Sequence, residues 1–281
     1  MRFPTALILI FSAVSSVSAQ EFTGMSDLLT QFSGIRDQAK AQKTTAQPPL
    51  RAMGASRLFQ AEADLTAAPN VSTYTVRGID ISHHQFTVDW IALKTSSLSF
   101  IYIKATEGAE GVDEDFAQNW AGAASAGLAR GAYHFYSFCK TGSEQADNFI
   151  KTVPADAAVL PPTVDIEESG DCRTLPSKAA FRKDLAAFVA KIESAYGRPP
   201  ILYINYRMYD KYLKGENDSY KYWIADVNHA APSLPSWTLW QYGWHGRVAG
   251  ITDEVDLDVF NGTPEEFSAM IGPSGLLVAQ P

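Results

Sequence analysis

The sequence has few basic residues for its acidic content and almost no cysteine. Lys and Arg number 23 against 31 Asp and Glu, so the formal net charge is −8. This charge argues against nucleic acid as the main partner and gives no attraction to anionic membranes. Only two cysteines occur. The 46% of hydrophobic residues, including 12 Tyr, 15 Phe and 6 Trp, are ample for a sizeable core.

Several common catalytic motifs are also missing. The chain has no P-loop, no dinucleotide-binding fingerprint and no G-x-S-x-G elbow. Neither cysteine has a convincing histidine partner in the sequence, so a cysteine peptidase is not expected. None of the five histidines has zinc-ligand spacing: His83, His84, His134, His229 and His245. We therefore expect no metal and no cofactor, and we expect His134, within a predicted strand, to be an interior residue.

Residues 1–19 have the pattern of a secretory signal peptide. One Arg precedes an apolar run from Ala6 to Val14, and small residues end at Ala19. No later apolar run approaches the ~20 residues of a membrane span. Cleavage would remove one Arg and no acid, which takes the net charge from −8 to −9. The sequence predicts a secreted protein, extracellular or periplasmic, that has no membrane attachment after cleavage.

A secreted location would allow the two cysteines to pair. Cys139 and Cys172 each follow a predicted strand end by a few residues, so their sulfurs can meet if those strands are neighbours. We expect a disulfide in an oxidising compartment. Closing this loop would stabilise the fold by roughly 3–4 kcal/mol in the chain-entropy model. Two free buried thiols are the alternative.

Three regions follow the predicted signal peptide. Residues 20–73 are rich in Ala, Gln, Thr and Ser and predict a linker. Apolar residues recur at helical spacing between Met25 and Ile35, which predicts one short amphipathic helix there. Residues 74–272 alternate between β-rich and helical segments, and residues 273–281 predict a loose tail.

The alternation predicts an α/β fold, an irregular β/α barrel of the TIM-barrel type. Strands are predicted at Val76–Ser82, Ser99–Ala105, Gly131–Tyr136, Thr163–Glu167, Pro200–Asn205, Tyr222–Val227, Thr238–Tyr242 and Val255–Phe260. Helices are predicted at Asp89–Thr95, Asp115–Ala126, Ser143–Thr152, Ser177–Tyr196 and Arg207–Leu213, with a short terminal helix after Thr263. Because the later strands have little helix between them, we expect a parallel barrel whose last part is irregular.

The short segment Val164–Glu168 carries the most chemical information. Side chains alternate along a strand, so Asp165 and Glu167 point to one side and Ile166 to the other. A glycosidase needs such a pair, because one acid protonates the leaving oxygen while another stabilises or attacks the cationic sugar. Mutual repulsion would help to keep one of them protonated near neutral pH. The alternative is a solvated acidic strand end, which this pattern alone would favour.

Other acids and aromatic residues also fall at predicted strand ends. The reactive groups of β/α barrels sit at the carboxyl ends of strands. Aromatic faces suit sugar rings, and amides and acids suit sugar hydroxyls. Each aromatic residue alone is more often a core residue, but their clustering favours binding. The candidate substrate-binding residues are Glu107, Tyr136, Tyr203, Asn205, Trp223, Trp240 and Gln241.

An ordered set of motifs resembles the glycoside hydrolase family 25 lysozymes. The motifs are Gly78-Ile79-Asp80-Ile81-Ser82, Ile103-Lys104-Ala105-Thr106-Glu107-Gly108, Gly131-Ala132-Tyr133-His134-Phe135-Tyr136, Val164-Asp165-Ile166-Glu167, Leu202-Tyr203, Trp240-Gln241-Tyr242 and Val255-Asp256-Leu257. The resemblance extends from about Val76 to Gly262. It implies an irregular β/α barrel and a muramidase, which cleaves the β-1,4 bond between N-acetylmuramic acid and N-acetylglucosamine in peptidoglycan.

The resemblance also implies roles for four acids as catalytic residues. Glu167 resembles the general acid, Asp165 resembles the residue that orients the substrate acetamido group, and Asp80 and Asp256 resemble supporting acids. The chain departs from the family pattern at Asp258, where Asn is frequent, and this adds a carboxyl group near the site. Because Asp165 and Glu167 are near neighbours, we expect retention of configuration with participation of the acetamido group. The expected partner is the peptidoglycan glycan strand, and the expected state is a monomer.

Two other functions stay open from the sequence. The first is hydrolysis of another N-acetylhexosamine polymer, such as chitin, although the strand before Glu167 lacks the first two acids of the common D-x-x-D-x-D-x-E chitinase pattern. The second is a barrel that binds peptidoglycan without cutting it. Glycan specificity would separate the first from a muramidase, and turnover would separate the second from both.

Overall fold

The structure is a computed structural model that describes residues 68–155, 160–168, 172–215, 220–234 and 236–271. The predicted signal peptide, the predicted helix between Met25 and Ile35 and the predicted tail lie outside the described residues. In the part that is described, no helix is long and apolar enough to cross a membrane.

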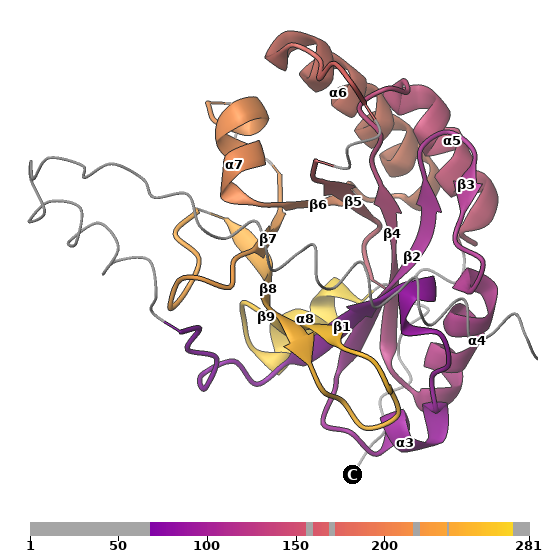
Figure 1. The fold of residues 1–281 in the computed structure, drawn as a ribbon, viewed down its shortest axis with the longest axis vertical. Helices are drawn as coiled ribbons and strands as arrows, with labels where there is room; N and C mark the ends of the chain where they lie inside the picture. Colours follow the sequence, from indigo (N-terminus) through magenta and orange to yellow (C-terminus); the bar gives the residue numbers. More distant parts are fainter. Residues whose placement is uncertain (1–67, 156–159, 169–171, 216–219, 235, 272–281) are drawn as a thin grey trace, which may run out of the picture. The chain divides into compact units, whose positions relative to one another are not determined.

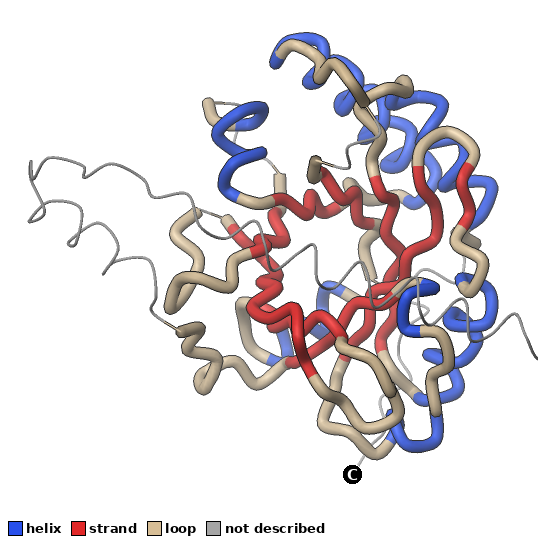
Figure 2. Tube along the Cα trace, viewed as in Figure 1, coloured by secondary structure: helices blue, strands red, loops and turns tan. Residues whose placement is uncertain are grey.

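Eight strands of the described residues close into a barrel (Figures 1 and 2). Their order around the ring is β1-β9-β8-β7-β6-β5-β4-β2, and the parallel pairing of β1 with β2 closes it. A two-residue strand, β3, extends β2 as a hairpin. The bounds are β1 Arg77–Ile81, β2 Phe100–Glu107, β3 Gly111–Val112, β4 Ala129–Phe135, β5 Thr163–Ile166, β6 Ile201–Ile204, β7 Tyr222–Ala225, β8 Trp237–Gly246 and β9 Val255–Phe260.

The predicted barrel and its strands are confirmed, and the irregular part is an antiparallel strand. β9 runs antiparallel to both of its neighbours, β8 and β1. Residues 247–254 join β8 to β9 without a helix. A parallel neighbour needs a crossover of a dozen or more residues, so this short connection permits only an antiparallel pair. As a result, the first residues of β9 lie at the same rim as the last residues of the parallel strands.

The predicted helices form outside the barrel, and three of them are long. The α4, α5 and α6 helices lie together along one side of the barrel in Figure 1. Their ends follow capping chemistry: Thr141 and Glu144 make a capping box at the start of α5, and Gly197 ends α6 with a φ of 70°. The helical bounds are η1 His83–Gln85, α3 Trp90–Lys94, α4 Phe116–Ala126, α5 Gly142–Thr152, α6 Lys178–Tyr196, α7 Tyr206–Met208, η2 Tyr209–Leu213 and α8 Pro264–Met270.

Alternation along the strands divides the core into two layers. In β2, Ile101 and Ile103 belong to the larger layer, which packs the barrel against the outer helices. Phe100 and Tyr102 belong to the smaller layer, together with residues of β6, β7, β8 and β9. Phe267 of α8 joins this smaller layer, with its ring centroid 5.5 Å from that of Phe100. Aromatic and aliphatic side chains therefore fill the barrel on the side of α8.

The predicted disulfide is confirmed between Cys139 and Cys172, whose Cα atoms are 5.4 Å apart. It ties the segment after β4 to the segment after β5. These strands are parallel neighbours, so their following segments leave the barrel at the same rim. The disulfide thus lies at the rim of the barrel to which Asp165 and Glu167 belong.

Candidate active site

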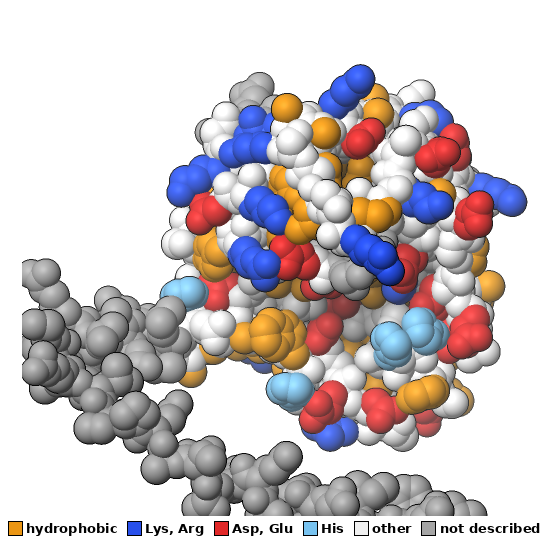
Figure 3. Space-filling model, turned by 45° about the horizontal axis from the view of Figure 1, so that its top comes forward, with side chains coloured by type: hydrophobic (Ala, Val, Ile, Leu, Met, Phe, Trp, Pro, Cys, Tyr) orange, Lys and Arg blue, Asp and Glu red, His pale blue; other side chains and the backbone are white. Residues whose placement is uncertain are grey.

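A pocket of about 420 Å³ opens at the carboxyl ends of the parallel strands. Four acids of the predicted site line it, and they come from three strands and the residue after one of them: Asp80, Asp165, Glu167 and Asp256. On the face shown in Figure 3, acidic side chains gather in the central hollow. The fold therefore brings together acids that lie as far apart as 176 positions in the sequence.

The pair predicted from the β5 sequence points into this pocket. Asp165 and Glu167 both line the pocket, while Ile166 between them is completely buried in the outer core layer. Asp165 is 7% exposed, and its Oδ1 has no hydrogen-bond partner among the described residues. Glu168 faces elsewhere and forms ion pairs with Arg207 and Lys211. Because Oδ1 is itself closed to solvent, a bound ligand would meet Asp165 through the small part of the residue that is exposed.

Burial, with repulsion from neighbouring acids at Asp165 and Asp256, raises the pKa values of these carboxyls. Burial, followed by the charges of Glu167 and Asp80, raises the pKa of Asp165 well above its ordinary value. Burial also raises the pKa of Glu167. Burial followed by the charges of Asp80 and Glu167 raises the pKa of Asp256 to about 8. The site can therefore donate a proton near neutral pH.

A hydrogen-bond chain orients Asp80. The side-chain amide of Gln241 donates to Asp80 Oδ2 at 2.9 Å. The Oε1 of Gln241 accepts from the hydroxyl of Tyr203 at 2.8 Å and from the indole Nε1 of Trp244 at 3.0 Å. Two donors on Oε1 fix which way the amide points, so its NH₂ must face Asp80. This hydrogen bond partly offsets burial, and the pKa of Asp80 is raised to about 6.

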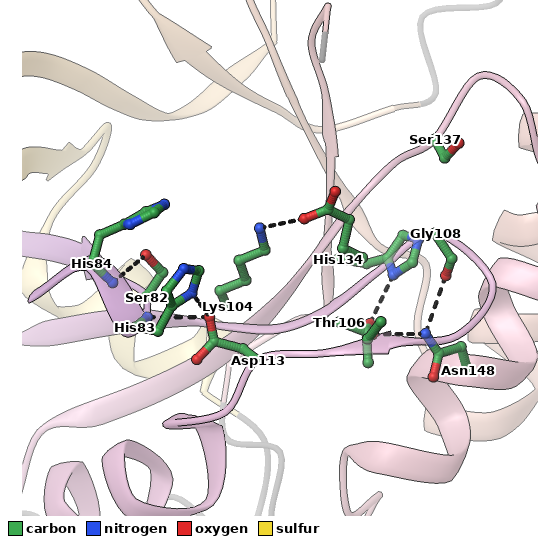
Figure 4. Close-up of polar contacts among 12 residues, drawn as sticks. Ser82, His83, His84, Lys104, Thr106, Gly108, Asp113, His134, Ser137 and Asn148 are labelled. Atoms are coloured by element: carbon green, nitrogen blue, oxygen red, sulfur yellow. Dashed lines mark hydrogen bonds and ion pairs between the residues drawn. The ribbon is translucent and has the colours of Figure 1, made fainter. Parts of the chain in front are cut away.

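Lys104 is a functional residue that the sequence analysis did not select. Its Nζ donates to Glu107 Oε2 at 2.7 Å, along the dashed line from Lys104 in Figure 4, and lies 4.6 Å from the ring centroid of Phe135. The side chain is only 13% exposed. Its charge lowers the pKa values of both Asp165 and Glu167 against the effect of burial. Alternation from the inward-facing Tyr102 would have placed Lys104 on the pocket side.

Two further hollows adjoin the pocket, each through a different pair of shared lining residues. One, of about 520 Å³, shares Lys104 and Glu107 with the pocket and extends along the β2–β3 hairpin. The other, of about 330 Å³, shares Glu167 and Tyr203 with it and extends past Trp244. Shared lining residues make the three a groove that crosses the acid pair. A groove of this kind accommodates an extended polymer and places its middle against the acids.

The comparisons with known proteins agree with this geometry. A family model described as glycosyl hydrolases family 25 matches residues 79–251. The chain belongs to glycosyl hydrolase family 25. It is 32% identical over 250 residues to "Lysozyme M1" of Streptomyces globisporus, covering 80% of this chain and 85% of that protein.

Solved structures give the same assignment. A family 25 glycosyl hydrolase from Bacillus anthracis has a TM-score of 0.67 and 34% identity, over 72% of this chain and 96% of that one. A bacterial lysozyme from Streptomyces coelicolor has a TM-score of 0.66 and 32% identity, over 71% of this chain and 98% of that one. The protein is therefore a glycoside hydrolase with the barrel of this family.

Five of the seven predicted substrate-binding residues line the groove of this family 25 enzyme. Asn205 is in the hollow beside Trp244, where its side chain also caps α7. The other four are in the central pocket: Glu107, Tyr203, Trp223 and Gln241. Other groove residues, which the sequence did not predict, are mostly aromatic or polar and come from β4, β5 and β8. The main ones are Tyr133, Phe135, Thr163 and Trp244.

Tyr136 and Trp240, the other two predicted binding residues, are buried in the core instead. Tyr136 is 1% exposed and packs edge-on against Phe181 and Phe188 of α6. Trp240 is completely buried, and its indole nitrogen donates to the backbone oxygen of Asp226 at 2.6 Å. Trp240 follows Leu239, which packs inside the barrel, so alternation turns the Trp240 side chain outward. Neither side chain can touch a ligand in the groove.

His134 is an interior residue, as predicted. It is completely buried, and burial lowers its pKa to about 4. The amide of Gln145 donates to the backbone oxygen of Ser137, so its Oε1 accepts from His134 Nε2 at 3.1 Å. Nδ1 then accepts from the Thr106 hydroxyl at 2.7 Å, a contact drawn in Figure 4. The neutral ring thereby joins β2, β4 and α5 behind the pocket.

Proposed function

We propose that this enzyme is a secreted muramidase that hydrolyses the β-1,4 bond between N-acetylmuramic acid and N-acetylglucosamine in peptidoglycan. The observation that carries the proposal is the acid pair Asp165 and Glu167 in the middle of a groove that continues on both sides. Relatives named as lysozymes support the same substrate. Aromatic and acidic side chains around the pair suit the rings and hydroxyls of an amino-sugar polymer.

Glu167 is the general acid in this proposal. Burial raises its pKa, which favours the protonated form that must be given to the leaving oxygen. It is less buried than Asp165 and lies where the central pocket meets the hollow beside Trp244. A proton donor at that junction can reach the oxygen between two sugars that occupy neighbouring parts of the groove.

Asp165 assists by holding the acetamido group of the sugar that is attacked. It lines the central pocket with Glu167, and the exposed part of its carboxyl can accept the amide hydrogen of that group. The amide oxygen would then attack the anomeric carbon as the bond to the leaving oxygen breaks, and Glu167 would protonate that oxygen. Asp80 and Asp256 support the pair by binding sugar hydroxyls. Glu107, Tyr203, Asn205, Trp223 and Gln241 complete the proposed binding set.

This mechanism predicts retention of configuration at the anomeric carbon. Neighbouring carboxyls on one strand leave little room for a water between them, whereas inversion requires that space. Proton NMR of the first-formed anomer during hydrolysis decides the point. A β-anomer as the first product supports acetamide participation, and an α-anomer contradicts it.

The decisive experiment measures new reducing ends released from purified peptidoglycan. Wild type should release them, and Glu167→Gln should lower kcat by roughly 10²–10⁴-fold because it removes the proton donor. Glu168→Gln is a matched control, since the adjacent acid pairs with Arg207 and Lys211 outside the pocket. Equal losses in the two variants would indicate a structural effect and would contradict the role of Glu167.

The same assay separates the two alternative functions. Chitin, incubated in parallel, should yield no new ends. Release from chitin alone would replace the proposed substrate with another N-acetylhexosamine polymer. Wild-type protein that pellets with peptidoglycan but releases no ends would be a binding module. Secretion is tested separately by determining the N-terminal residue of protein recovered from the medium, which should be Gln20. The monomeric state is tested by sedimentation of the purified protein.

A further inference from the structure

Asp258 on β9 is a carboxyl that the proposed mechanism does not use. It is completely buried behind the pocket. The indole Nε1 of Trp223 donates to its Oδ1 at 2.9 Å. Its other oxygen, Oδ2, has no donor among the described residues. A buried carboxylate with one hydrogen bond is costly, so the environment of the second oxygen requires an explanation.

The sheet places Asp258 beside Asp80. In the antiparallel pair of β1 with β9, Asp258 is opposite Gly78, and Asp80 is opposite Asp256. Asp258 is thus the diagonal neighbour of Asp80 on the same face of the sheet. The two carboxyls are close enough for each to affect the pKa of the other through a side-chain hydrogen bond.

Two carboxylates cannot make that hydrogen bond, because both only accept. One of the pair must keep its proton. Asp80 is 9% exposed, lines the pocket and already accepts from the Gln241 amide. Asp258 is deeper, with no exposure at all. The buried member of such a pair loses more by ionising, so the proton belongs on Asp258.

The other titratable groups around Asp258 favour the same assignment. They are Asp80 on β1, Asp256 on β9, Tyr102 on β2 and Tyr242 on β8. Arg198 acts on Tyr102 and Arg77 acts on Tyr242, but neither is among the charges that act on Asp258. The Tyr102 hydroxyl donates to the backbone oxygen of Pro161 at 3.0 Å, so its proton is already committed elsewhere.

We propose that Asp258 is a positioning residue, which remains a neutral carboxylic acid at neutral pH and donates its hydroxyl to Asp80. With Gln241 this gives Asp80 two donors, which fix it as an oriented carboxylate on the pocket wall. The directions of the pKa shifts agree: the pKa of Asp258 is raised well above its ordinary value by burial, and its hydrogen bond lowers that of Asp80. The charge state rests on the sheet register, the burial of Asp258 and its contact with Asp80, and it does not depend on the proposed function; the importance of Asp80 does depend on that function.

The charge state is tested by carbon-13 NMR of protein labelled at the aspartate side-chain carboxyl carbon. The resonance lost in Asp258→Asn identifies Asp258, and at pH 7 its wild-type shift should be that of a protonated acid. Asp113→Asn is the matched control, because Asp113 accepts from the His83 and Asp115 backbone amides and from the His83 ring, as expected of a carboxylate. A carbon-13 chemical shift typical of an ionised carboxylate for Asp258 at pH 7 overturns the proposal.

Activity on peptidoglycan tests the positioning role. Asp258→Asn keeps a donor toward Asp80 and an acceptor for Trp223, so it should keep most of kcat/KM with the pH profile unmoved. Asp258→Leu removes the donor and should lower kcat/KM by roughly tenfold or more, with a displaced acid limb. If the leucine variant does not fold, the asparagine variant still decides. Removal of a negative charge would shift its profile to lower pH, and that shift would contradict a neutral Asp258.

Failure of the proposed function can be distinguished from failure of the Asp258 proposal. If the proposed function is wrong, wild type releases no ends from peptidoglycan, while the NMR experiment still reports the charge of Asp258.

Discussion

Asp80 and Asp256 face each other directly across the antiparallel pair of β1 and β9. Like charges in directly opposed positions repel, and burial adds to the cost of ionising both. The pKa of Asp80 is raised to about 6, and that of Asp256 to about 8. The active-site rim is therefore a place where the folded state holds protons that the unfolded chain would release.

Stability should consequently fall as the pH rises. Both pKa values are higher in the folded state than in the unfolded chain, so the stabilisation is complete below about pH 4 and is lost as the pH passes 6 and then 8. These groups alone predict a lower Tm at pH 8 than at pH 5. Asp256→Asn should flatten this slope and raise Tm at pH 8, measured by thermal unfolding. An unchanged slope in the variant would show that Asp256 is ionised throughout.

Lys104 should set the position of the pH–activity profile. Its charge lowers the pKa values of Asp165 and Glu167, so Lys104→Met should raise both and move both limbs of the profile to higher pH. Glu107→Gln is the matched control, because it removes the ion-pair partner and leaves the Lys104 charge in place. That variant should move the limbs to lower pH. A shift in the same direction for both variants would contradict an electrostatic role.

The sequence was sufficient to predict the barrel and its eight strands from local patterns, and the four acids from alternation together with the family resemblance. The alternation in Val164–Glu168 placed Asp165 and Glu167 in the pocket, and the strand-end rule placed Asp80 beside them, whereas Asp256 reaches the same rim because β9 is antiparallel. It could not separate Trp223, which faces the interior, from Trp240, which faces outward. Both are aromatic residues near a strand end, and the register of the barrel strands decides which side of the sheet each of them faces.

Long-range contacts were the other part that the sequence could not provide. The hydrogen bonds from Tyr203 and Trp244 to Gln241 join residues from different strands, and no motif encodes them. The contact of Asp80 with Asp258 depends on the antiparallel direction of β9, whereas the sequence favoured a parallel barrel with an irregular last part. Strand direction thus decided which carboxyls became neighbours.

The Cys139–Cys172 disulfide should contribute to stability by restricting the unfolded chain. The two residues are 33 positions apart, and closing a loop of that length is worth roughly 3–4 kcal/mol. The double variant Cys139→Ser, Cys172→Ser should lower the free energy of unfolding by about that amount, measured by urea denaturation. Reduction of the wild type should produce a similar loss. A loss below about 1 kcal/mol in both would mean that the unfolded chain is already restricted there.

The two donors on Gln241 Oε1 should differ in their effects on binding and turnover. Tyr203 is half-buried beside Glu167, whereas Trp244 is 49% exposed at the edge of the groove. Tyr203→Phe removes only a hydroxyl, and Trp244→Phe keeps an aromatic face but loses the indole donor.

Either change leaves one donor on the amide, so each should lower kcat/KM on peptidoglycan by only a few-fold. Together they release the amide to rotate away from Asp80, and the loss should exceed the product of the single losses. The double-mutant cycle measures this excess. Strictly multiplicative losses would indicate that Gln241 is held by its packing and that the two hydrogen bonds do not orient it.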